Sequence, residues 1–118
     1  MFPQSALSTL YVKGSLKNTA AGFEFCVKNT IDSTSLYGAG PILVDGQAAP
    51  LERVTLSVAA QEMRGQDISS QRRLAVTYGA LVTIRVDGQT LSSGEHRIVV
   101  AVSSSDAGRV QFEVRDSV

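Results

Sequence analysis

Apolar and polar residues alternate along most of the chain, with a period of two. Segments 22–28, 53–59, 82–88, 96–103 and 110–116 show this alternation most clearly. In "GFEFCVK", for example, Phe23, Phe25 and Val27 share one face, and Glu24 and Lys28 lie on the other. This pattern is typical of half-buried strands. Weaker strands are expected at 10–16, 42–44 and 74–78, and the last of these places Tyr78 on a core face.

The pattern predicts an all-β fold, an antiparallel β-sandwich of about seven to eight strands. Each strand with one polar face has to bury its other face against a second layer. Segment 98–102 is apolar on both faces, so it should be central or covered. No segment has a convincing helical period, although "AAQEMRGQD" could form one helical turn that Gly65 interrupts. We expect residues 1–118 to form one domain.

The tetrapeptide "VDGQ" occurs at 44–47 and again at 86–89, each time after a β-branched run. Asp and Gly readily adopt the positive φ angles of tight turns. The flanking sequences differ, so each copy is interpreted as a turn that leaves a strand rather than as a repeat.

Two stretches lack this alternation, 29–41 and 59–73, and both are predicted to be long loops. The first carries Ile31, Leu36 and Tyr37 among small and polar residues. Apolar residues on a loop either fold back on the core or are offered to a partner. "GAGP" at 38–41 is interpreted as a tight turn before the proline.

Charge and composition exclude several functions. Eleven basic and eleven acidic residues cancel, and "RR" at 72–73 is the longest basic run, which disfavours nucleic acid and acidic membranes as partners. Cys26 is the single cysteine and favours a reducing compartment. The start "MFPQSALSTLYVKG" has neither the basic segment nor the long apolar run of a signal peptide or membrane span. A cytoplasmic location is therefore expected.

The residues offer little catalytic chemistry. His96 is the single histidine and lies in phase with Ile98, so we interpret it as a residue at the edge of the core rather than a general base. Cys26 falls on a polar strand face with no histidine beside it to activate the thiol. One His, one Cys and scattered carboxylates cannot make the usual metal sites. We predict no catalytic, cofactor-binding or metal-binding residue in this chain.

The run "GSLKNTAAGFEFCVKNTIDSTSLYGAGPILVDGQ", followed by "LSSGEHRIVVAV", resembles the small (beta) subunit of bacterial C-glycoside deglycosidases. The resembling elements are "SLKN", "GFEF", "VDG" and "SGEH", which extend over most of the chain. The resemblance implies a non-catalytic subunit of a heteromeric lyase. That enzyme cleaves the carbon–carbon glycosidic bond of 3-oxo-C-glycosides of plant flavonoids.

The resemblance also implies a larger, barrel-type alpha subunit that holds a divalent metal, often manganese, and the acid–base groups. Ile31, Leu36 and Tyr37 are then the expected anchors on that partner. The alternative interpretation is a stand-alone β-sandwich module that binds carbohydrate or another ligand.

Overall fold

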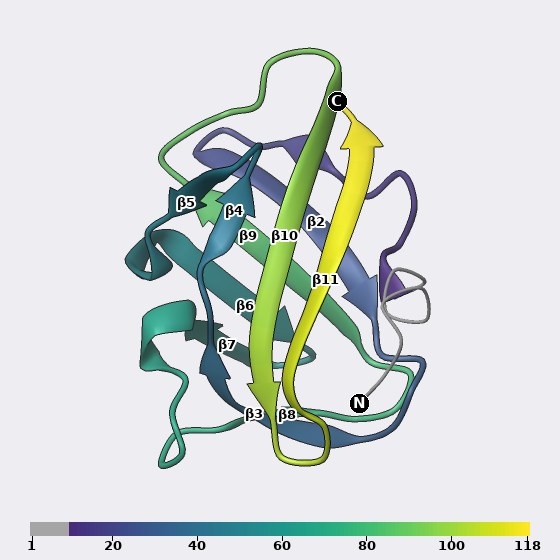
Figure 1. Ribbon diagram of the computed structural model, residues 1–118, viewed down its shortest axis with the longest axis vertical. Helices are drawn as coiled ribbons and strands as arrows, with labels where there is room; N and C mark the ends of the chain where they lie inside the picture. Colours follow the sequence, from purple (N-terminus) through teal and green to yellow (C-terminus); the bar gives the residue numbers. More distant parts are fainter. Residues whose placement is uncertain (1–9) are drawn as a thin grey trace.

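A computed structural model, which describes residues 10–118, contains two antiparallel sheets packed face to face (Figure 1). The first sheet has five strands in the spatial order β1 (Lys17–Asn18), β2 (Gly22–Lys28), β9 (Leu81–Asp87), β6 (Val54–Val58) and β7 (Gln61–Arg64). The second sheet contains β5 (Gln47–Ala49), β4 (Ile42–Val44), β10 (Glu95–Ser104), β3 (Thr34–Ala39), β8 (Leu74–Val76) and β11 (Gly108–Ser117). The predicted all-β sandwich is confirmed, with more and shorter strands than expected.

Strand β10 is the centre of the second sheet. One edge pairs with β11 along its whole length, and the other pairs first with β4 and then with β3. Ile98 and Val100 point into the core, and Ala101 on the opposite face is also buried, as its apolar sequence predicted.

The core is made by the residues whose alternation predicted it. Phe23 and Phe25 of β2, Val54 of β6 and Ile98 of β10 are completely buried. Burying four such side chains contributes roughly 1.5–3 kcal/mol each to folding. Two short 3-10 helices, Leu51–Arg53 and Gly65–Asp67, lie between strands.

The prediction of a loop at 29–41 was wrong for its second half. Residues 34–39 form β3, and β4 continues in the same direction along β10 after Gly40 and Pro41. The Gly40 N–H still donates to the Ala101 carbonyl at 2.7 Å, so "GAGP" is a kink in an interrupted strand and not a turn. A Cβ at Gly40 would lie 2.8 Å from the Ala101 Cβ, which explains the glycine.

The second predicted loop, 59–73, also begins as a strand. Ala59 has a positive φ of 53° and turns the chain from β6 into β7, which pairs with β6 as an edge strand. The helical turn considered for "AAQEMRGQD" is therefore replaced by a hairpin followed by a 3-10 turn. Tertiary pairing outweighs the weak local helical preference of these residues.

Both "VDGQ" copies leave strands, as predicted, but they make different connections. Asp45 (φ 50°) and Gly46 (φ 88°) form the two-residue turn of the β4–β5 hairpin. Asp87 ends β9, and Gly88 (φ 96°) begins the crossover to β10 in the other sheet.

The weaker strand predictions were partly correct. Ile42–Val44 is β4, and β8 covers only Leu74–Val76 of the expected 74–78. In 10–16 the pairing is a single bridge from Tyr11 to Val27. Tyr78 is 65% exposed, so its placement on a core face was wrong. Residues 1–9, which include most of the start that was examined for a leader, lie outside the described part.

Candidate functional site

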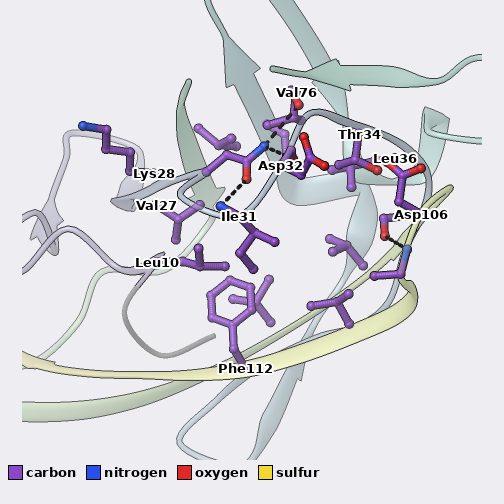
Figure 2. A pocket seen from close by; sticks show the side chains of 18 of the residues that line it. Leu10, Val27, Lys28, Ile31, Asp32, Thr34, Leu36, Val76, Asp106 and Phe112 are labelled. Atoms are coloured by element: carbon purple, nitrogen blue, oxygen red, sulfur yellow. Dashed lines mark hydrogen bonds between the residues drawn. The ribbon is translucent and has the colours of Figure 1, made fainter. Parts of the chain in front are cut away.

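An apolar cleft opens between the two sheets at the end of the sandwich where β2 ends and β11 begins (Figure 2). It holds about 130 Å³, and nearly all of its lining surface is apolar. Ile31 points toward Leu10 and Phe112 across the cleft, whereas the Lys28 side chain extends away from it (Figure 2). A dry cavity of this size takes a small apolar ring or a side chain.

The mouth of the cleft is built around Asn29, which follows β2. Its amide nitrogen donates to the carbonyls of Asp32 at 2.7 Å and Val76 at 3.2 Å, and its oxygen accepts the Ile31 N–H at 3.2 Å. This one side chain therefore ties the loop after β2 to the end of β8 and fixes Ile31 over the cleft. Sequence reasoning missed Asn29, although Asn after a strand is a common signal for such side-chain-to-backbone turns.

Two exposed apolar side chains belong to the segments that meet at this end of the sandwich. Leu81, at the start of β9, is 55% exposed and pairs with Lys28, whose side chain extends away from the cleft. Tyr78 is tied to the same loop because its N–H donates to the Ser33 hydroxyl at 2.8 Å. This group of Ile31, Tyr78 and Leu81 is called the apolar end below.

The three residues expected to contact a partner are placed differently. Ile31 is half-buried at the cleft, Leu36 is buried inside it, and Tyr37 is 37% exposed. The Arg73 guanidinium lies over the Tyr37 ring, 5.6 Å from its centre. The structure thus brings Ile31 and Leu36 to one cleft and leaves Tyr37 outside it; contact with a partner remains a prediction for all three.

His96 lies at the opposite end of the sandwich and is held on both sides. Its Nδ1 is 2.6 Å from the Asp45 carboxylate and its Nε2 is 2.7 Å from the Ser92 carbonyl. Both partners are acceptors, so this geometry favours a proton on each ring nitrogen, which is the imidazolium form. These bonds, first that to Asp45 and then that to Ser92, raise the pKa of His96.

Asp45 completes this clamp. Its other oxygen accepts the Arg97 N–H at 2.9 Å, and that bond, together with the His96 bond, lowers the pKa of Asp45. His96 is buried, as predicted for a residue at the edge of the core. Its partner comes from the first "VDGQ", 51 positions away, a pairing that no local pattern indicates.

The remaining candidate chemistry is sparse. Cys26 is a free, half-buried thiol whose sulfur lies 3.5 Å from the Thr83 hydroxyl oxygen. Within residues 10–118, no group of three or more His, Cys, Asp or Glu is placed to hold a metal ion. Over the same residues, no helix is long and apolar enough to cross a membrane.

Comparison with known proteins decides the family. The family model described as "Hydroxymethylglutaryl-CoA reductase, N-terminal domain" matches residues 6–118. The chain belongs to this family. No curated protein matches the sequence.

Membership of the hydroxymethylglutaryl-CoA reductase N-terminal domain family corrects the earlier assignment. The resemblance to C-glycoside deglycosidase beta subunits was wrong, and with it the inferred carbon–carbon lyase and flavonoid glycoside chemistry. The stand-alone carbohydrate- or ligand-binding module is not supported either. The family name instead indicates an oxidoreductase.

The motifs that suggested the resemblance have structural roles that explain the error. In "SLKN", the Asn18 side chain pairs with both backbone groups of Leu91, at 2.8 and 2.9 Å. "GFEF" supplies Phe23 and Phe25 to the core, and "SGEH" supplies the His96 clamp. Short strand and turn motifs of this kind serve folding in many β-sandwiches, so they do not specify a family. The barrel partner and its manganese rested on that resemblance alone, and no observation bears on them.

Proposed function

We propose that this chain is a non-catalytic N-terminal domain of a hydroxymethylglutaryl-CoA reductase, with the reducing chemistry in another domain or subunit. The observation that carries the proposal is the family match, which extends over residues 6–118. Fold alone does not assign an activity, and the sandwich by itself would fit many roles.

The chemistry of the reaction supports a non-catalytic role. Reduction of a thioester needs a hydride donor, ordinarily a reduced nicotinamide, and a group that protonates the developing oxyanion. His96, the single histidine, has both ring nitrogens occupied by Asp45 and Ser92. It cannot donate to a substrate without breaking the clamp.

The apolar end supports a contact surface for the catalytic part. Tyr78 and Leu81 are the most exposed large apolar side chains of residues 10–118, and Ile31 lines the cleft in the loop to which Tyr78 is hydrogen-bonded. Aromatic and aliphatic side chains of this kind form the centres of protein interfaces. We assign the contact to this end, so Ile31 is expected to contact the catalytic part more closely than Tyr37.

The same proposal places the assembly in the cytoplasm. The free thiol of Cys26 suits a reducing compartment, where unpaired cysteines persist.

The test is co-elution of activity with the chain. An affinity-tagged copy of the chain is expressed in the organism that encodes it and is purified through the tag. The eluate is assayed for hydroxymethylglutaryl-CoA-dependent oxidation of a reduced nicotinamide. We expect this activity to elute with the tagged chain and to be absent from a tag-only control. If the eluate contains the chain but no such activity, the proposal fails.

A further inference from the structure

Strand β11 forms a long free edge at the margin of the second sheet (Figure 1). The other edge strands, β1, β5, β7 and β8, are two to four residues long, whereas β11 has ten. It pairs with β10 on one side and with no strand of residues 10–118 on the other. Short edges limit pairing with other chains, so β11 is the edge best suited to receive another strand.

The outward backbone groups of β11 have no partner within residues 10–118. Gly94 and Val118 exchange both backbone hydrogen bonds, at 3.2 and 3.0 Å, and this pair fixes the alternation along β10 and β11. The N–H and C=O groups of Gln111, Glu113 and Arg115 therefore point away from β10. Gln111 and Arg115 are also exposed, so the edge is open to solvent there.

The charges on this edge are complementary to those of a second copy. The Arg115 Nε lies 2.7 Å from the Glu113 carboxylate on the outer face of the same strand. When two copies of β11 run antiparallel about a two-fold axis at Val114, each Glu113 lies opposite Arg115 of the other copy. Opposite charges in such cross-strand pairs are stabilising, and outward backbone groups along 111–117 meet in hydrogen-bonded pairs.

Other alignments of two β11 strands fit less well. An axis at Glu113 places the two Glu113 side chains opposite each other, and an axis at Phe112 places Arg115 opposite Arg109. An axis at Gln111 would need Arg109 to meet Glu113. The Arg109 guanidinium instead lies on the far side of β10, where its Nη2 is 3.5 Å from the position of a Cβ on Gly40.

We propose that β11 pairs antiparallel with β11 of a second copy of this chain, with the two-fold axis at Val114. The pairing joins the two six-stranded sheets into one continuous sheet. A single strand pair buries less surface than the roughly 1,200–2,000 Å² of a stable interface, so the dissociation constant should be about 100 µM. The inference does not depend on the proposed function, because it uses no catalytic part.

Sedimentation velocity of the full chain between about 10 and 500 µM tests the pairing, and we expect a reversible monomer–dimer equilibrium. Glu113→Arg and Arg115→Glu should each weaken self-association about tenfold, because each places like charges opposite each other. An equimolar mixture of the two variants should dimerise like the wild type, since every Arg then meets a Glu. A wild-type chain that stays monomeric, or a mixture that does not recover, overturns the proposal.

Hydrogen exchange locates the contact. The outward N–H groups of Gln111, Glu113 and Arg115 should exchange more slowly as the chain concentration rises. Gln111→Pro removes one of them without breaking the pairing with β10 and should abolish the dimer, whereas Gln111→Ala should not. Protection at every concentration, or only when the catalytic part is present, would overturn self-pairing. Unchanged melting temperatures at low concentration show that each variant is folded.

Discussion

The His96–Asp45 clamp is the residue-scale feature with the clearest physical consequence. The pKa of His96 is raised in the folded chain, so its contribution to stability is complete below the unfolded value of about 6.5 and is lost at higher pH. The pKa of Asp45 is lowered, so its contribution is present above about 3.9 and is lost at lower pH. The clamp therefore stabilises the fold most between these two values.

A pH series of urea unfolding checks this sign. We expect the free energy of unfolding to fall over the pH interval above about 6.5, and His96→Gln to remove most of that fall. Asp45→Asn should reduce the fall in the free energy of unfolding over the same pH interval, because it removes the charge that stabilises the imidazolium. A His96→Gln protein with the full wild-type pH dependence would show that another group is responsible.

Gly22 allows the backbones of β2 and β9 to approach closely. A Cβ there would lie 2.0 Å from the Val86 carbonyl oxygen and 2.9 Å from the Asp87 Cα, so β2 and β9 would have to move apart. We expect Gly22→Ala to lower the free energy of unfolding by about 1–3 kcal/mol. Gly38→Ala is the control, since its Cβ would make an ordinary contact 3.6 Å from the Ser103 Cβ.

At the element scale, the loop after β2 depends on one amide. Asn29→Ala removes its bonds to Asp32, Val76 and Ile31, and should cost about 1 kcal/mol while speeding hydrogen exchange at the Ile31 N–H. Thr30→Ala, at an exposed neighbouring position, should leave that exchange rate unchanged. Equal exchange in both variants would mean that β3 and β8 hold the loop without Asn29.

Strands with regular alternation were predictable, and strands held only by pairing were not. The alternation in β2, β6, β9, β10 and β11 follows directly from one buried face. Strand β3 escaped prediction because "TSLYGA" has few β-branched residues and leads into Gly40 and Pro41. It is a strand because β10 and β8 supply its hydrogen bonds from both sides.

The candidate sites were less predictable than the strands, because they join distant parts of the chain. The chemistry of His96 depends on Asp45, and a hollow on the outer face of the five-stranded sheet is lined by Arg53, Arg64 and Arg85 from three elements. The sequence indicated Ile31 as an unusual loop residue but not its neighbour Tyr78, which strand periodicity assigned to the core. Such contacts arise from sheet order, which spacing along the chain does not show.

At the scale of the whole molecule, the proposed assembly depends on the apolar end. We expect the double variant Tyr78→Ser, Leu81→Ser to weaken the affinity of this chain for the catalytic part about tenfold or more. The free energy of unfolding of the isolated chain should change by less than about 0.5 kcal/mol, because both side chains are exposed. Limited proteolysis separates this chain from the catalytic part, and the yield of cross-linked product between the two then measures their contact.

Tyr37→Ala is the matched comparison for that double variant. It removes an exposed aromatic that stacks on Arg73 outside the apolar end, and it should leave the contact intact. A larger effect from Tyr37→Ala than from the double variant would move the interface to the outer face of β3.

We propose that this chain is part of a reductase and does not itself perform the reduction. The most direct test is turnover, with the isolated 118-residue chain and the assembly purified through its tag assayed side by side for hydroxymethylglutaryl-CoA-dependent oxidation of a reduced nicotinamide. We expect steady turnover by the assembly and none above the buffer control by the isolated chain. Steady turnover by the isolated chain, or none by the assembly, would contradict it.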